Sequence, residues 1–185
     1  MATKEQFDYE AVKKIGRDLL IAIGEDPDRE GLKETPRRFA SMWQEFIEYN
    51  AGKQETVFDS VSVNQMVVVK GMKVWSMCEH HLLPFYCDVS VAYIADNKLL
   101  GLSKFGRIAK KHSHKLQVQE RLVNDIAADI MKVTNSNDVA VIAKGEHLCM
   151  TMRGVELPAT MISSCLNGVF MNNPQARMEF LELLK

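Results

Sequence analysis

The spacing of apolar residues in this 185-residue chain changes near Lys53. Before that point apolar residues recur every three or four positions, which is the period of one helix face. After it they form β-branched or alternating runs, which are typical of strands. The sequence therefore predicts an N-terminal helical arm, residues 1–55, followed by a sheet-containing domain, residues 56–185.

Two amphipathic helices are expected in the arm. The first begins at Asp8 and ends near Gly24, where the apolar stripe stops. In the second, Thr35 is the expected N-cap and Pro36 occupies the first helical position, where its missing N–H costs nothing. Its apolar stripe ends before Gly52.

The strand patterns after Lys53 are short and separated by turn residues. They contain β-branched residues or alternate apolar and polar side chains, as half-buried strands do. The expected strands are MVVVKG, KVWSM, CDVSVAYIA, a segment beginning at KLLGLS after a turn at Asp96–Asn97, VAVIAKG, EHLCMTM, and Ala159–Cys165.

Three further helices are expected among these strands. Ser103 is a candidate N-cap for a short helix to about His112, and apolar spacing predicts a longer helix from about Gln117 to Val133. Asn173 and Pro174 are the expected N-cap and first residue of the last helix. Because the strands stand before and after a helical pair instead of alternating with helices, the pattern predicts the α+β class with an antiparallel sheet.

The charge balance excludes a general affinity for polyanions. Lys and Arg number 23 against 24 Asp and Glu, which gives a net charge of -1. Neither nucleic acid nor an anionic membrane surface is therefore an expected partner. The first residues, MATKEQFDYE, are polar and acidic, and no stretch approaches the ~18 apolar residues of a membrane span. We expect a cytoplasmic protein.

Metal-ligating residues gather in two short segments. Cys78, His80 and His81 lie within four positions, and His147 and Cys149 lie together far along the chain. In a strand, His147 and Cys149 would point to the same face. Thiolates and imidazoles suit Zn²⁺, and three protein ligands leave a fourth position for water, as in catalytic zinc sites. Five candidates for three places leave two histidines to carry protons.

Two other interpretations of these residues remain open from spacing alone. Four of them can form a closed zinc site that only stabilises the fold. Alternatively there is no metal, because buried cysteines are commonly inert and histidine pairs occur on ordinary surfaces. Cys87 and Cys165 have no ligand-like neighbours, and we interpret both as packing residues.

Basic residues that suit phosphate concentrate in the run Ser103–Arg107. Lys104 and Arg107 are three positions apart on an expected helix, so they share a face near its N-terminus, which also favours anions. Arg38 and Arg153 are further candidates. The alternative for each is a solvated surface cation. No GxxxxGK[ST] or GxGxxG motif is present, so any triphosphate must be bound by side chains.

A carboxylate opens the long predicted helix in the segment QVQER. Glu120 there is able to accept hydrogen bonds from paired N–H donors, such as N1 and the 2-amino group of guanine. The alternative is that Glu120 only complements the helix dipole in the first turn.

Five segments, TPRR, SMCEHHLLPF, GLSKFGRIA, LQVQERL and EHLCMTMRG, occur in this order and together resemble the GTP cyclohydrolase I family. The resemblance extends from the TPRR helix to the C-terminal EFL segment. It implies that Cys78, His81 and Cys149 are the zinc ligands and that His80 and His147 transfer protons. It further implies that Gln119 and Glu120 recognise guanine, while the triphosphate and ribose are held by Ser103, Lys104, Arg107, Arg153 and, from another subunit, Arg38.

The same resemblance implies an activity and an assembly. The family hydrolyses GTP at C8 to 7,8-dihydroneopterin triphosphate and formate, the first step of pterin and folate or of deazapurine biosynthesis. The implied fold is the tunnelling fold, in which an antiparallel sheet carries two helices on one face. Its sheets join around a central β-barrel in a toroidal homo-oligomer, commonly a decamer, with active sites between subunits. The chain departs from the common pattern at Lys115 and in the stretch ELPATMISSC.

Two competing functions belong to other classes. One is a non-catalytic, zinc-stabilised oligomer that binds a pterin or purine nucleotide, and the presence of both His80 and His147 argues against it. The other is a zinc nucleobase deaminase. That chemistry expects H-x-E paired with P-C-x-x-C, whereas a single cysteine lies near residue 149.

Overall fold

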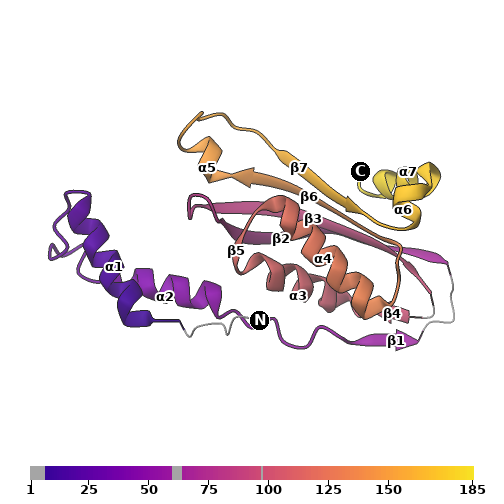
Figure 1. Cartoon of the computed structure of the whole chain (residues 1–185), viewed down its shortest axis with the longest axis horizontal. Coiled ribbons are helices and arrows are strands. Elements are labelled where there is room, and N and C mark those ends of the chain that lie inside the picture. Colours follow the sequence, from indigo (N-terminus) through magenta and orange to yellow (C-terminus); the bar gives the residue numbers. More distant parts are fainter. Residues whose placement is uncertain (1–6, 60–63, 97) are drawn as a thin grey trace. The chain divides into compact units, whose positions relative to one another are not determined.

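The computed structural model describes residues 7–59, 64–96 and 98–185 (Figure 1). The chain separates into two compact units, Met1–Tyr49 and Asn50–Lys185. Asn97, half of the expected turn at Asp96–Asn97, lies outside the described residues.

The N-terminal unit is a helix pair, α1 (Tyr9–Ala22) and α2 (Thr35–Ile47). The predicted start of α1 is confirmed, since the Asp8 side chain accepts a hydrogen bond from the Ala11 N–H. The N-cap prediction for α2 is wrong by one residue. Glu34 is the N-cap, without a side-chain bond, and Thr35 already belongs to the helix. The earlier start is compatible with Pro36, because the first turn of a helix has no intrahelical use for its N–H groups.

The second unit is built on a five-stranded sheet in the order β5-β2-β3-β6-β7 (Figure 1). All neighbouring strands are antiparallel except β2 and β5, which are parallel. The strands are β2 (Gln65–Cys78), β3 (Pro84–Ala95), β5 (Leu116–Gln117), β6 (Val139–His147) and β7 (Met161–Leu166). A separate antiparallel pair joins β1 (Val57–Asp59) to β4 (Lys98–Leu100). The structure is a mixed α+β protein, as the sequence predicts.

Two expected strands, MVVVKG and KVWSM, form one long strand, β2. Its register against β3 shifts between Val69 and Met72, where Gly71 adopts a φ of 77°. Glycine adopts this conformation at little cost, so the strand continues through a bulge instead of ending.

The prediction of a strand over the segment EHLCMTM is wrong. Strand β6 continues to His147, and the chain then enters a short helix, α5 (Leu148–Thr151). The predicted cap at Ser103 is also wrong, because α3 (Leu102–Ser113) has Gly101 as its N-cap. The Gly101 N–H pairs with the Thr56 carbonyl, which places the N-cap two residues before Ser103.

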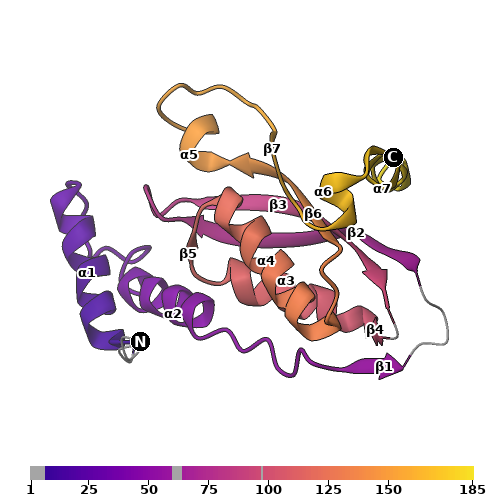
Figure 2. The ribbon, with the colours of Figure 1, turned by 45° about the vertical axis from the view of Figure 1, so that its right-hand side comes forward.

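Helices α3 and α4 (Gln119–Thr134) lie side by side along one face of the sheet (Figures 1 and 2). Alternate sheet residues, such as Val91 and Val141, pack with apolar residues of both helices in the main core. Their neighbours Ala92 and Ala140 face the other side. There they pack with Phe170 of α6 (Val169–Asn172) and Phe180 of α7 (Pro174–Leu183).

The last helix begins as predicted. Asn173 is its N-cap and accepts from two backbone N–H groups, and Pro174 follows it. No helix in the described ranges is long and apolar enough to span a membrane.

Candidate functional site

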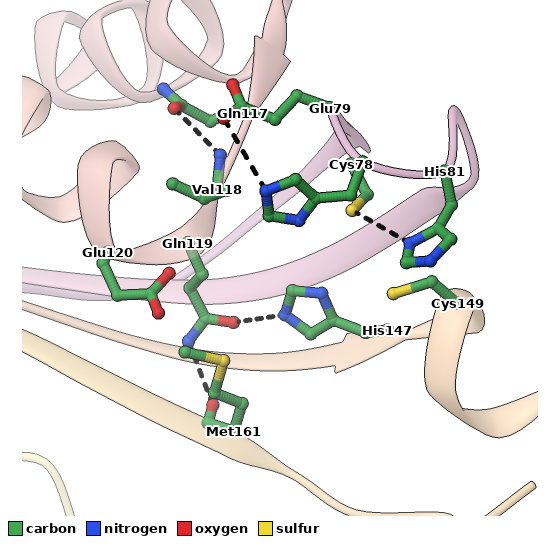
Figure 3. A pocket seen from close by; sticks show the side chains of 11 residues that line it. Cys78, Glu79, His81, Gln117, Val118, Gln119, Glu120, His147, Cys149 and Met161 are labelled. Carbon is green, nitrogen blue, oxygen red and sulfur yellow. Dashed lines mark hydrogen bonds and ion pairs between the residues drawn. The ribbon is translucent and has the colours of Figure 1, made fainter. Parts of the chain in front are cut away.

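One pocket of about 490 Å³ opens where the end of β2, the β5–α4 junction and the β6–α5 junction meet (Figure 3). Its lining contains most of the residues singled out from the sequence. The residues that line it are Cys78, Glu79, His80, His81, Gln117, Val118, Gln119, Glu120, His147, Cys149 and Met161.

Three potential metal ligands converge in this pocket. Cys78 is the last residue of β2, and a tight turn returns the chain, since the Leu82 N–H bonds to the Cys78 carbonyl. The turn brings His81 Nδ1 to 3.9 Å from Cys78 Sγ. Cys149 joins them from α5, and the ligand atoms of all three residues lie within 4.8 Å of one another.

The route by which Cys149 reaches this group differs from the expectation. His147 and Cys149 do not share a strand face, because β6 ends at His147 and Cys149 lies in α5. A helix turns about 100° per residue, so residues two apart no longer point the same way. Cys149 therefore joins the metal-ligand group, while His147 lines the pocket beside it.

The geometry suits zinc. Tetrahedral Zn²⁺ with Zn–S near 2.3 Å and Zn–N near 2.0–2.1 Å places its ligand atoms roughly 3.6–3.8 Å apart. The 3.9 Å between Cys78 and His81 is close to this value. Within the described ranges, the candidate group holds three residues, so these residues could hold a metal ion with one position left open. Burial raises the pKa of the Cys149 thiol, and the neighbouring Cys78 raises that pKa further.

His147 is held from two sides. Its Nε2 lies 2.8 Å from Gln119 Oε1, and its ring stacks on Phe85 with centroids 4.6 Å apart and planes 7° apart. Burial lowers the pKa of His147, and the nearby Glu120 carboxylate opposes that shift. The neutral ring is therefore the favoured form near neutral pH.

His80 is exposed, and its Nε2 lies 3.9 Å from Glu79 Oε1. Glu79 in turn accepts a hydrogen bond of 2.6 Å from Arg121. The CEHH turn is thus tied to the first turn of α4. His80 and His147 line one pocket and so occupy places from which protons can be exchanged with a bound molecule.

The two candidates for base recognition differ in exposure. Glu120 is exposed at the pocket, whereas Gln119 is fully buried. The Gln119 amide nitrogen donates to the carbonyls of Ala143 and Met161, each at 3.0 Å.

Of the candidate phosphate ligands in the second unit, only Arg153 lies beside the metal-ligand group. Its guanidinium is 3.5 Å from His81 Nε2 and 3.4 Å from the Cys149 carbonyl. Ser103, Lys104 and Arg107 belong to α3 and do not line this pocket. Lys104 donates to the Lys53 carbonyl at 2.9 Å and Arg107 to the Ala51 carbonyl at 2.7 Å. Arg38 is an exposed residue of α2 in the N-terminal unit.

Several site residues have no role in the sequence interpretation. Phe85 and Met161 carried no signal, because an aromatic ring or a methionine in a strand is usually core. Gln117 is fully buried, and its amide nitrogen donates to the Asp125 carboxylate at 3.2 Å. Lys115, where the chain departs from the common family pattern, donates to the same carboxylate at 2.6 Å.

The remaining cysteines are packing residues, as predicted. Cys87 is fully buried in the main core, and Cys165 packs against it. Burial raises the pKa of Cys87 to about 12, so its thiol stays protonated and inert.

The fold and the pocket define a class of protein: an α+β protein with a three-ligand candidate metal centre flanked by histidines. The sequence matches the GTP cyclohydrolase I family over residues 12–185. It is 46% identical over 179 residues to GTP cyclohydrolase 1 of Aquifex aeolicus, covering 96% of this chain and 97% of the relative. Identity is 44% over 185 residues to GTP cyclohydrolase 1 of Dehalococcoides mccartyi, covering 97% and 98%. It is 45% over 185 residues to that of Thermoanaerobacter pseudethanolicus, covering 96% and 97%. The chain belongs to the GTP cyclohydrolase I family.

Proposed function

We propose that this chain is a zinc-dependent GTP cyclohydrolase I, which hydrolyses GTP to 7,8-dihydroneopterin triphosphate and formate. This reaction begins pterin and folate biosynthesis or deazapurine biosynthesis. One observation carries the proposal: Cys78, His81 and Cys149 meet in a pocket that His147 and Glu120 also line. Relatives that share nearly the whole length of the chain have the same named activity.

Zinc is the proposed metal, because two thiols and one imidazole form a donor set that it prefers. When bound, Zn²⁺ would supply Lewis-acid activation of water at neutral pH. The histidines then do the proton chemistry. As water adds at C8 of the purine, His147 or His80 takes the proton that the water gives up and passes a proton to N7, and the imidazole ring opens. A second hydration at the same carbon releases it as formate.

Recognition of GTP is assigned to the remaining charged and polar groups. The exposed Glu120 carboxylate suits the N1–H and 2-amino donors of guanine, and the family resemblance assigns the preceding residue, Gln119, to the same base. Ser103, Lys104, Arg107, Arg153 and Arg38 are the proposed ligands of the triphosphate and ribose. Lys104 and Arg107 bond to backbone carbonyls, so their charges remain available to phosphate.

An assembly with sites between subunits would unite these groups. Strand β7 is one edge of the sheet, and β5 pairs with β2 only at Met77 and Cys78. Both edges therefore offer backbone groups for pairing with other copies. We propose the tunnelling fold in a toroidal homodecamer, with residues 1–55 as an arm on a neighbouring subunit and 56–185 as the catalytic domain. Size-exclusion chromatography with light scattering measures the mass of the protein in solution, and the mass of a monomer would contradict the proposed assembly.

The proposal also includes GTP as the substrate partner, a cytoplasmic location, and no nucleic acid or membrane partner. The near-neutral charge balance supports the absence of a polyanionic partner.

The decisive experiment incubates the zinc-loaded protein with GTP and measures formate together with the fluorescent pterin formed after oxidation. Cys149→Ala is the matched variant, and we expect it to lose both bound zinc and turnover. Zinc bound without formate production in the unaltered protein would support the non-catalytic alternative and reject the enzyme.

A further inference from the structure

We propose that Gln119 is a positioning residue that determines which ring nitrogen of His147 carries the proton and which faces the substrate. The inference rests on the proposed function, because it concerns the histidine assigned there to proton transfer. It gives Gln119 a role other than guanine recognition.

The orientation of the Gln119 amide follows from its three hydrogen bonds. Carbonyl oxygens only accept, so the atom that lies 3.0 Å from both the Ala143 and the Met161 carbonyls must be the NH₂ group. The amide oxygen then faces His147 Nε2 at 2.8 Å. The reverse orientation would place an oxygen against two oxygens and leave a buried amide unpaired, which is costly.

A fixed amide fixes the imidazole. Because Oε1 only accepts, His147 must hold a proton on Nε2 to make the 2.8 Å bond. The neutral ring therefore keeps its lone pair on Nδ1. Figure 3 shows this second nitrogen on the side of the ring away from Gln119, and no described group hydrogen-bonds to it. A proton that His147 passes to or takes from a bound purine is thus exchanged at Nδ1, while the Nε2–H bond stays intact.

The surroundings hold Gln119 rigidly in this role. It is fully buried, so solvent does not compete for its amide. Gly145 lies beneath it in β6, where an added Cβ would overlap Gln119 Oε1 and approach Cys87 Sγ to 2.9 Å. On the His147 side, stacking on Phe85 sets the plane of the ring. Burial, the bare backbone of Gly145 and the Phe85 ring thus leave one orientation for the pair.

Burial also separates Gln119 from base recognition. Both amide hydrogens and the oxygen are engaged, and the side chain exposes no surface through which guanine could reach it. Glu120, the next residue, is exposed at the pocket and is free to face the base. The two adjacent residues therefore have separate roles, one behind His147 and one toward guanine.

The test compares Gln119→Met with the unaltered zinc-loaded enzyme. Methionine keeps the volume but can neither accept from His147 nor donate to the carbonyls. We expect kcat with GTP to fall by about 10²-fold, as for a lost general acid–base group, with KM within about twofold. The preference for GTP over inosine triphosphate, which lacks the 2-amino group, should not change. Glu120→Gln should lower that preference.

A spectroscopic measurement separates positioning from a general structural role. In protein labelled with ¹⁵N-histidine, the His147 signals, assigned by their loss in His147→Ala, should report a proton on Nε2. In Gln119→Met they should shift toward a mixture of the two tautomers. Gln117→Met also removes a buried glutamine amide, but it does not touch His147 and should leave those signals unchanged.

Gln119→Glu is the conservative variant, and it tests the idea if the methionine variant folds poorly. It keeps the acceptor for His147 Nε2, and in its protonated form still donates to one carbonyl. It should therefore retain the tautomer and more of the activity. An unchanged kcat with a tenfold rise in KM and a lost preference for GTP would overturn the proposal, as would an unaltered His147 spectrum in Gln119→Met. Absence of formate in the unaltered protein would reject the proposed function instead, and the spectrum would still test the tautomer.

Discussion

Arg121 Nη2 lies 2.6 Å from Glu79 Oε2, which joins the first turn of α4 to the turn that carries the metal-ligand candidates. Both side chains are partly exposed, so water screens the pair. We expect Arg121→Gln to lower the free energy of unfolding by less than about 1 kcal/mol. Urea denaturation measures this, with the exposed pair Lys14–Asp18 as a reference for a surface bridge. A loss of several kcal/mol would mean that the bond is protected from solvent.

His80→Ala should separate metal binding from turnover. His80 is exposed and outside the group Cys78, His81 and Cys149, so the variant should bind zinc as the unaltered protein does. Its kcat should fall about 10²–10⁴-fold if His80 carries protons. Zinc content and formate release are measured on the same preparation. Normal turnover in this variant would remove His80 from the mechanism.

Removal of the metal should destabilise the fold. A ligand that binds only the folded state contributes about 2.7 kcal/mol at 100 times its Kd. Dialysis against a chelator should therefore lower the thermal midpoint of the unaltered protein, and added Zn²⁺ should restore it. Cys149→Ala is the control, and its midpoint should be insensitive to both treatments. Equal responses of the two proteins would place the metal elsewhere.

Acid should destabilise the α3–α4 contact around His112. Burial lowers the pKa of His112, against the opposing effect of Asp129, whose carboxylate lies 2.8 Å from its Nε2. The folded state thus binds a proton less readily than the unfolded state. As pH falls below about 6.5, the unfolded state takes up a proton first, and the free energy of unfolding decreases.

The neighbouring Asp129 carboxylate also makes the fold less stable in acid, but at lower pH than His112 does. Burial alone would raise the pKa of Asp129, but hydrogen bonds from Lys111 and His112 together hold that pKa below its ordinary value. Its contribution is present at neutral pH and is lost as the pH falls toward and below about 4.

The contribution of His112 is measured by urea denaturation at several pH values between 7 and 5. The free energy of unfolding should decrease as the pH falls, and His112→Gln should reduce the slope of that decrease. An identical slope in the variant would assign the dependence to other groups.

Two glycines should respond oppositely to alanine. At Gly145 an added Cβ overlaps Gln119, so Gly145→Ala should destabilise by about 1–3 kcal/mol. Gly106 is in α3, and an added Cβ there meets no atom within 4 Å. Gly106→Ala should stabilise by roughly 0.5–1 kcal/mol through helix propensity. Thermal unfolding of both variants measures the two changes in stability. Equal shifts of the thermal midpoint in one direction would contradict the packing described for β6.

Local patterns predicted the helices well because capping and period are short-range properties. Helix α1 begins beside Asp8 and Asn173 caps α7, both as expected, since a helix start depends on a few adjacent residues. Errors arose where a distant partner decided the outcome. The start of α3 is set by the bond from Gly101 to Thr56, and β2 continues through Gly71 because β3 pairs on both sides of the bulge.

The metal-ligand candidates could be identified from residue type alone, because few side chains bind zinc and these occur at close spacing. How they meet could not. The short helix α5, which brings Cys149 to Cys78 and His81, is a departure from the extended pattern of its own residues.

The sequence by itself determined the class of fold, the family, and the donor atoms available for a metal, since these follow from residue type, period and order. Only the tertiary structure decided that Gln119 faces His147 instead of solvent, and that Lys104 and Arg107 bond to the segment before β1. The physical reason is that a hydrogen bond requires two groups within about 3 Å at a suitable angle. That distance depends on where separate elements converge, which no local pattern encodes.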